Sequence, residues 1–285
     1  MTCFPSSIPS SNSGPTLQLL TADDAAERVL GEYMAMKEIF DTLPSIAPKP
    51  HGYGKCEIQP AHFFVCDYLS LTHENPDPVR LGEKLAQLHR DSKSPNGMFG
   101  FHCTTFDGKL PLNTTWDPSW TSFFKKLMHD VYQLDVQVNG FWQELDDVIS
   151  ITLDKLIPRL LDPLTAEGRS IKPALIHGDL WESNIGTDLQ GDIYIYDACA
   201  YYAHHEKEVG IWRVEHHKMK DEDYRNEYFK NYEPSEPIEE FDDRNTLYAV
   251  ETLIINSAHF PGSETRQRAV DELRFLIDRY QPEFK

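Results

Sequence analysis

The sequence predicts a two-lobed α+β protein, with a reduced N-terminal sheet lobe before a larger, mainly helical C-terminal lobe. Its 285 residues are enough to build two lobes. Segments of strand type predominate up to about residue 70, and beyond about Leu71 apolar residues recur mostly at helical spacing, apart from one hairpin that ends at Asp197. We therefore assign residues 1–15 to a disordered tail, 16–70 to a truncated N-terminal lobe and 71–285 to the C-terminal lobe.

The N-terminal lobe is expected to contain one helix and a small sheet. A Ser/Pro-rich stretch without apolar periodicity, 6–15, comes before it. Thr21 is expected to cap the helix, because acidic residues fill the first turn and apolar residues up to Phe40 follow at helical spacing. Two strands are expected around 53–58 and 62–68, joined by a turn that contains a proline.

The C-terminal lobe is expected to be a series of amphipathic helices. Asp77-Pro78 and Asp117-Pro118 each place a capping residue before a proline, which suits the first turn of a helix. A longer amphipathic segment runs from Gly140 to about Leu164. Further helices are expected near 207–213, 221–232, 242–259 and 263–280.

The most informative stretch is the loop 177–184, His-Gly-Asp-Leu-Trp-Glu-Ser-Asn, followed by the strand 193–196. Phosphoryl transfer from ATP needs a group that accepts the proton of the attacking hydroxyl, and Asp179, at the end of a strand, suits that role. Asn184, five residues later, and Asp197, directly after the second strand, can hold the magnesium ion that bridges the phosphates. The pattern therefore predicts a catalytic hairpin with all three side chains at one cleft.

The same Asp-to-Asn spacing occurs in the catalytic loop of protein kinases, and the variant with Gly between His and Asp is that of small-molecule kinases on the same fold. The chain resembles the fructosamine kinase family, or ketosamine 3-kinases, which includes the protein-ribulosamine 3-kinases and is related to the aminoglycoside phosphotransferases. The similarity runs from about Glu27 to Pro261 and is closest to the fungal branch. The residues that carry it are Gly31-Glu32-Tyr33, Ala47–Pro50, Leu85–His89, Gly97–Phe101, the loop 177–184, Asp197-Ala198-Cys199, Tyr202-Ala203-His204, Glu206, Glu208, Trp212-Arg213 and Asp242–Asn245.

The resemblance implies a protein-kinase-like fold and an ATP-dependent kinase that phosphorylates the 3-hydroxyl of a ketoamine sugar, either on a small molecule or on a lysine of a glycated protein. It also implies roles in nucleotide binding. Glu32 would lie on the helix that faces the phosphates, and backbone groups of Cys66, Asp67 and Tyr68 would meet the adenine.

The resemblance further implies that His177 and Trp181 lie beside the substrate. Trp181 would offer an apolar face to the sugar ring. A tryptophan that anchors the loop in the core explains the same residue equally well.

Two features depart from the family pattern. Almost nothing precedes Leu17, so the glycine-containing hairpin that covers the phosphates is expected to be missing. Gln18, fourteen residues before Glu32, stands where the family has the lysine that orients the α- and β-phosphates. A charge-assisted hydrogen bond contributes about 1.5–3 kcal/mol, so losing the lysine should lower the rate roughly ten- to a few-hundred-fold.

Three interpretations follow. The chain is a working ketosamine-type kinase, which the intact Asp179, Asn184 and Asp197 favour. It is instead a weak or inactive kinase-like protein that binds a ligand or a partner, which Gln18 favours. Or it is a kinase-fold enzyme recruited to other small-molecule chemistry, such as a biosynthetic step.

The composition limits which binding partners and which cellular compartment we expect for this protein. A formal net charge of −19 argues against nucleic acid, whose binding depends on cations that meet phosphates, and suits an amine-bearing substrate. No apolar run is long enough to span a bilayer and no secretory signal opens the chain, so we expect no membrane association. Five scattered cysteines, an odd number, are typical of reduced thiols, and we expect a cytoplasmic protein.

Overall fold

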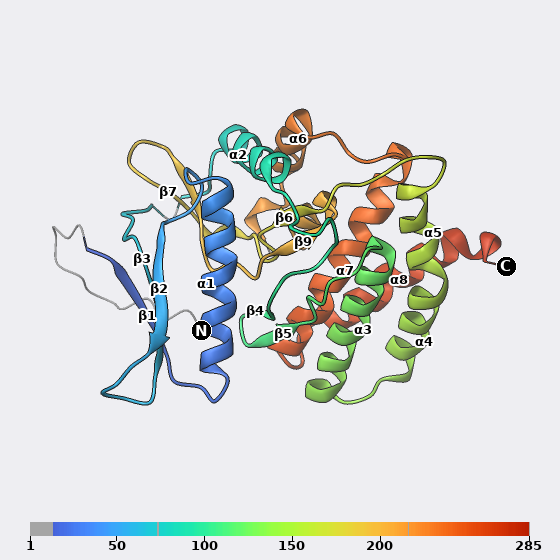
Figure 1. Ribbon diagram of the computed structural model, residues 1–285. Coiled ribbons are helices and arrows are strands. Elements are labelled where there is room, and N and C mark those ends of the chain that lie inside the picture. The colour runs from blue at the N-terminus through green and yellow to red at the C-terminus, as the bar shows by residue number, and fades with distance from the viewer. Residues whose placement is uncertain (1–13, 73, 216, 285) are drawn as a thin grey trace.

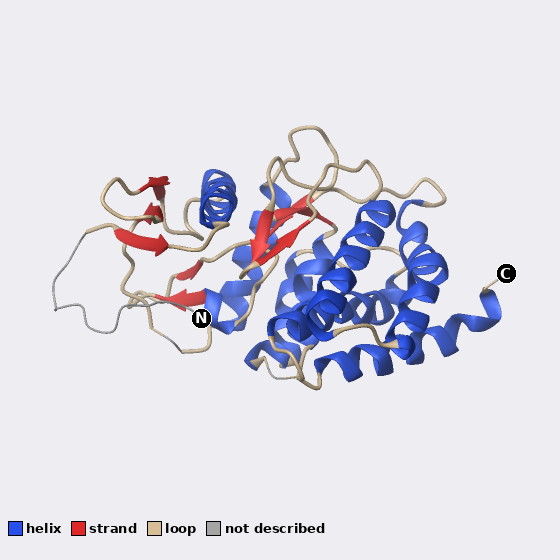
Figure 2. Ribbon diagram, turned by 90° about the horizontal axis from the view of Figure 1, so that it is seen from below, coloured by secondary structure: helices blue, strands red, loops and turns tan. Residues whose placement is uncertain are grey.

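The computed structural model describes residues 14–72, 74–215 and 217–284. Figures 1 and 2 show a small sheet at one end of the molecule and a bundle of helices at the other. The predicted α+β fold class is confirmed. The predicted disordered tail and the predicted loss of the phosphate-covering hairpin concern residues that lie almost entirely outside the described ranges, so both stay predictions.

The sheet of the N-terminal lobe has three antiparallel strands in the order β1-β3-β2. They are β1 (Thr16–Leu20), β2 (Pro50–Lys55) and β3 (His62–Cys66). β1 lies at one edge and is largely exposed, and its register sets Gln18 opposite Phe64. The helix α1 (Ala25–Thr42) packs against β2 and β3 (Figure 1).

α1 begins later than the sequence predicts. Asp24 is the N-cap residue, and the expected cap at Thr21 is wrong, because residues 22–24 form a turn closed by a hydrogen bond from Ala25 N to Ala22 O at 3.1 Å. Gly31 then decides how closely the helix approaches the C-terminal lobe. A Cβ atom on Gly31 would lie 2.6 Å from the backbone oxygen of Thr104, so only glycine allows this contact. The next residue, Glu32, is thereby set at the junction of the lobes.

One of the two predicted proline-associated caps is confirmed and the other is displaced. α2 (Pro78–Asp91) is capped by Asp77, whose carboxylate accepts a hydrogen bond from Arg80 N at 2.9 Å. α3 (Trp120–Asn139) is capped by Ser119. Asp117 accepts from Ser119 N at 2.8 Å and pairs with Lys126, so it orders the turn before the helix.

The remaining helices lie near their predicted positions. α7 is the centre of the C-terminal lobe, because all its residues from 243 to 255 are buried and α3, α5 and α8 pack around it (Figure 1). No helix within the described ranges has the length and apolar character that crossing a membrane requires. The bounds are α4 (Gln143–Ile151), a π-helical turn (Thr152–Leu156), α5 (Ile157–Leu161), α6 (Glu222–Asn231), α7 (Phe241–His259) and α8 (Thr265–Tyr280).

Three short antiparallel strand pairs complete the fold and hold the loop 177–184. β6 leads into this loop and β8 leads to Asp197, and both strands are anchored by buried apolar residues. The predicted strand at 193–196 corresponds to β8. The pairs are β4 (Thr105–Asp107) with β5 (Leu110–Leu112), β6 (Ala174–Ile176) with β9 (Tyr201–Ala203), and β7 (Ile185–Thr187) with β8 (Ile193–Ile195).

Candidate active site

Asp179 and Asn184 are joined across one tight loop. The loop leaves β6 and closes with a 3-10 turn, Glu182–Asn184. The side-chain nitrogen of Asn184 donates to the backbone oxygen of Asp179 at 2.8 Å and to its carboxylate at 2.9 Å. Because both amide hydrogens are used in this way, the side-chain oxygen of Asn184 is the atom that can meet a cation.

The tightness of the loop depends on Gly178. Its φ of 88° lies in the left-handed region that favours glycine, and a Cβ atom there would lie 2.7 Å from the Cys199 sulfur and 2.9 Å from the Cys199 backbone oxygen. The backbone of the loop therefore lies directly against the segment that follows Asp197.

Glu208 holds the backbone of the loop 177–184 in place. It lies on the 3-10 segment His205–Arg213 and is buried, and its carboxylate accepts from the backbone N–H groups of His177 at 2.5 Å and Gly178 at 3.1 Å. Burial acts to raise the pKa of the Glu208 carboxyl, but the His89 ring, whose Nε2 lies 3.4 Å from the carboxylate, outweighs it and holds the pKa below its ordinary value. Glu208 is thus an anion that holds two backbone donors in place. Trp212 adds a second anchor by donating to Leu180 O at 2.7 Å.

His177 does not line a substrate site. The side chain is fully buried, and its Nε2 meets the backbone oxygen of Tyr196 at 2.9 Å. Its other ring nitrogen accepts from the Asp179 N–H at 3.3 Å, so both nitrogens are occupied. The predicted contact with substrate is wrong. The histidine ties the catalytic loop to the end of β8, because a polar residue at this depth must use its hydrogen bonds internally.

Asp197 meets Glu32 of α1 where the two lobes join. Asp197 has a left-handed backbone, with φ of 59°, a conformation that is uncommon outside glycine and often marks functional sites. The two carboxyl groups lie close enough to interact, because burial first and then the charge of Asp197 raise the pKa of Glu32 well above its ordinary value. Burial also raises the pKa of Asp197. Two carboxyl groups this close can hold a proton or a cation between them.

Gln18 of β1 lies near the same Glu32 carboxyl, and its side-chain amide acts against the rise in the pKa of that group. Gln18 brings no charge to this position. A role for Gln18 in nucleotide binding stays a prediction.

The predicted adenine-binding segment begins where β3 ends, at Cys66. Its groups are partly engaged already, since Asp67 N donates to Lys49 O at 2.9 Å and the Asp67 carboxylate meets His51 at 2.6 Å. An adenine would therefore have to meet the carbonyl of Asp67 or the backbone of Tyr68, whose side chain is 42% exposed. Burial raises the pKa of the Cys66 thiol to about 12, which keeps it protonated.

Trp181 is anchored in the core, while its predicted contact with the sugar ring stays a prediction. The side chain is partly buried and packs on the core, and its ring centroid lies 5.7 Å from that of His217. Its side chain also acts to lower the pKa of the Asp179 carboxyl, against the larger effect of burial. Trp181 thus anchors the loop close to the predicted base.

Asp107 is a site residue that the sequence reasoning missed. Its neighbour on the same face of β4, Thr105, donates to Cys199 O at 3.1 Å, beside Gly178. Burial first, and then the charge of Asp107, raise the pKa of Asp179 well above its ordinary value. The Asp107 carboxylate pairs with His259 at the end of α7, at 2.9 Å. The signal in the sequence was Asp107-Gly108, a hairpin turn that brings the strand end to the loop.

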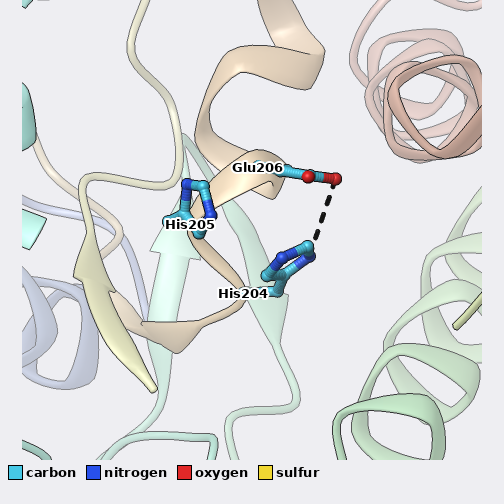
Figure 3. Close-up of side chains that lie close together, drawn as sticks. All are labelled: His204, His205 and Glu206. Carbon is cyan, nitrogen blue, oxygen red and sulfur yellow. Dashed lines mark ion pairs between the residues drawn. The ribbon is translucent and has the colours of Figure 1, made fainter. Parts of the chain in front are cut away.

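A second cluster of polar groups lies deeper, where His204, His205 and Glu206 approach one another (Figure 3). Each could offer one metal ligand, but their atoms already have partners. Glu206 forms a two-pronged ion pair with Arg244 at 2.8 and 2.9 Å, and the rings of His204 and His205 bond to Tyr248 and Tyr228, both at 2.9 Å. This internal network therefore supports the segment that carries Glu208.

A hollow of about 640 Å³ lies apart from these residues, between α3, β5 and the segment 101–104. Polar side chains such as Asn113, Asp130 and Gln133 line it together with Trp116. It contains none of the predicted site residues, so the site rests on the geometry of the loop and not on this hollow.

The fold and the grouping of Asp179, Asn184, Asp197 and Glu32 define a kinase-like phosphotransferase. The chain belongs to the fructosamine kinase family, whose sequence profile matches residues 17–278. The chain is 28% identical over 254 residues to the chloroplastic protein-ribulosamine 3-kinase of Oryza sativa subsp. indica, covering 88% of this chain and 68% of the relative. It is 27% identical over 209 residues to the ketosamine-3-kinase of Mus musculus, covering 64% and 63%.

Solved structures show the same fold. The putative fructosamine-3-kinase of Thermobifida fusca YX-ER1 matches with a TM-score of 0.74 at 18% identity, covering 94% of this chain and 87% of that chain. An aminoglycoside phosphotransferase matches with a TM-score of 0.62 at 13% identity, covering 94% and 87%. The predicted family and the predicted kinase-like fold are therefore confirmed, while the fungal branch stays a prediction.

Proposed function

We propose that this protein is a magnesium-dependent kinase that transfers the γ-phosphoryl group of ATP to a sugar hydroxyl of a ketoamine. The observation that carries the proposal is the joining of Asp179, Asn184 and Asp197 on one buried scaffold, with Glu32 brought to them from α1. Relatives named protein-ribulosamine 3-kinase and ketosamine-3-kinase support the same substrate class.

Asp179 is the proposed base. Burial and the nearby charge of Asp107 raise its pKa, and a raised pKa makes a carboxylate a better proton acceptor. The hydrogen bond that it accepts from Asn184 at 2.9 Å holds the carboxylate in one orientation. The acceptor hydroxyl would approach from the side of the carboxylate that this bond leaves open.

The residues present fit a magnesium ion. Asn184 has its side-chain oxygen left over, and Asp197 and Glu32 supply carboxylates, which together form the oxygen-rich donor set that this ion prefers. When bound, magnesium would neutralise charge on the phosphoryl oxygens. The left-handed backbone of Asp197 turns its side chain from β8 toward Glu32 and so positions this donor set.

An amine on the substrate would meet a negative surface. Asp107 lies close enough for its charge to act on Asp179, and its pairing with His259 holds the carboxylate in position. We propose that Asp107 attracts the amino group of the ketoamine. The net charge of −19 supports such a substrate, on a small molecule or on a glycated lysine, over nucleic acid. The free thiols of Cys56, Cys66, Cys103 and Cys199 support a cytoplasmic location.

One observation favours a second candidate, a kinase-like protein that binds a ligand or partner with little turnover. Gln18 contacts Glu32 without a charge, which leaves less positive potential for the phosphates. This candidate differs from the first in rate and not in the location of the site.

The test is transfer of labelled phosphate from ATP to a ribulose–lysine adduct, with free ribulose as the acceptor that lacks the amine. We expect magnesium-dependent transfer to the adduct, with at least tenfold lower kcat/KM for free ribulose. Asp107→Asn should raise KM for the adduct about tenfold, in line with one lost charge contact, and leave KM for free ribulose unchanged. No transfer to either acceptor, with intact ATP binding, would favour the second candidate.

A further inference from the structure

The phosphate side of the site lacks positive charge among the groups described so far. Gln18 is neutral, and Glu32 and Asp197 are acidic. A nucleoside triphosphate carries several negative charges, and phosphoryl-transfer sites meet them with cationic side chains as well as with metal ions. The inference below rests on the proposed function, because it concerns how the same site holds ATP.

Arg28 lies one helical turn before Glu32 on α1. Residues four apart share a face of a helix, so the Arg28 side chain emerges on the face that carries Glu32 to the junction of the lobes. Its positive charge acts on Glu32 and opposes the rise in the pKa of that carboxyl. Arg28 thus places a permanent cation one helical turn from Glu32, near enough for its charge to act on that carboxyl group.

Stabilisation of α1 does not account for Arg28. Its Nε is buried and has no hydrogen-bond partner. Its Nη1 lies 3.6 Å from the Asp24 carboxylate, beyond hydrogen-bond distance, and that carboxylate is 41% exposed. Exposed ion pairs contribute little, whereas a guanidinium brings five N–H donors that need acceptors when buried. The arrangement leaves donors that suit an incoming anion.

We propose that Arg28 binds a phosphate group of the nucleotide and supplies the positive charge that Gln18 does not. A guanidinium matches two phosphate oxygens with two parallel N–H groups, which gives it both charge and direction. Glu32 then orients Arg28 from one turn away along α1. The cation reaches the phosphates from the helix, while the edge strand β1 provides only a neutral amide.

The test is calorimetric binding of MgATP and of adenosine to the unchanged protein and to Arg28→Gln, which keeps a good helix former at this position. We expect MgATP affinity to fall about tenfold to a hundredfold, in line with the loss of a charged hydrogen bond. Adenosine affinity should not change, because adenosine has no phosphate. Gln18→Lys added to Arg28→Gln should restore most of the lost affinity.

Lys37→Gln is the matched control, because it removes one positive charge from an exposed position of the same helix. It should leave MgATP affinity unchanged. Arg28→Lys keeps the charge but loses the paired donors, so it should bind MgATP at least threefold more weakly than the unchanged protein. If Arg28→Gln does not fold, the same binding measurements are made with Arg28→Lys instead.

Three results would overturn the inference. Full MgATP affinity in Arg28→Gln, or in Arg28→Lys where that variant carries the test, would show that Arg28 does not meet a phosphate. Equal losses for MgATP and adenosine would show a structural effect. Absence of MgATP binding by the unchanged protein would overturn both this inference and the proposed function. The first two results would overturn this inference alone.

Discussion

In the C-terminal lobe, the loop with Asp179 and Asn184 rests on buried side chains, whereas in the N-terminal lobe Gln18 rests on an exposed edge strand. Glu208 holds two backbone N–H groups of the loop and Trp212 holds a third backbone group. On β1, Leu17 is 55% and Leu19 is 43% exposed. The half of the site with the proposed base and metal ligands is thus fixed by the core, whereas the strand that carries Gln18 is not.

This difference indicates where activity is limited. The groups that need exact placement for proton transfer and metal binding lie on the rigid half, and preorganised groups of this kind supply much of the rate. Gln18, which is predicted to stand where the family has its phosphate-orienting lysine, lies on the exposed strand β1. We therefore expect substitutions at the proposed base and metal ligands to abolish most activity. Substitutions near Gln18 should raise or lower activity only moderately.

The largest expected effect is on the base. Asp179→Asn should lower kcat for phosphotransfer about 10³-fold, because the proton acceptor is lost, while MgATP affinity and thermal stability change little. Steady-state kinetics and calorimetry on the same preparation measure both. Asp192→Asn, which makes the same charge change at an exposed position of the β7–β8 hairpin, should keep full activity. Equal phosphotransfer by Asp179→Asn and the unchanged protein would remove Asp179 from this role.

The next largest effect is on the metal. Asp197→Ala should raise the apparent KM for MgATP about a hundredfold and raise the magnesium concentration needed for half activation, because a carboxylate ligand is lost. Titrating magnesium at fixed ATP measures this. An unchanged magnesium dependence would exclude Asp197 as a ligand.

The support of the loop should affect stability more than binding. Glu208→Gln should lower the free energy of unfolding by about 2–3 kcal/mol, because the buried acceptor of two N–H groups loses its charge. For a chain of this size that is a fall of roughly 5 °C or more in the melting temperature. Asp242→Asn, which breaks the exposed pair with Arg213, should cost less than about 1 kcal/mol. Similar losses in the two variants would mean that the loop is less firmly held than the structure indicates.

The smallest effect tests the weaker half directly. Gln18→Lys should raise MgATP affinity or turnover about tenfold, because it adds a charged contact next to Glu32. Leu19→Lys is the control, since it adds the same charge on the opposite face of β1. A gain in Leu19→Lys equal to that in Gln18→Lys would indicate a general charge effect. No gain in either would place the phosphates away from Gln18.

Local sequence patterns were enough to predict the rigid half. Asp179, Asn184 and Asp197 lie on a short loop and the strand after it, so their spacing nearly determines their geometry. The cap of α2 at Asp77 was predicted for the same reason. The caps expected at Thr21 and Asp117 were displaced by three and two residues, because each neighbouring turn offers competing hydrogen bonds.

Contacts between distant segments were beyond the sequence alone. His177 looks like a site residue until the fold buries it against the Tyr196 carbonyl. The pair Asp107-Gly108 signals only a hairpin turn, and the role that we propose for Asp107 depends on the way β4 packs against the Cys199 backbone. Arg28, our proposed phosphate ligand, resembles any charged residue of an amphipathic helix until the fold leaves its Nε buried without a hydrogen-bond partner. In each case tertiary packing decides the role.

The most direct test of the central claim, that an intact metal half still binds nucleotide, is calorimetric titration of the purified protein with ATP in the presence and absence of magnesium. We predict saturable binding at one site that requires magnesium and is strongly weakened in Asp197→Ala. Absence of binding under both conditions, or binding of equal strength without magnesium, would contradict the account.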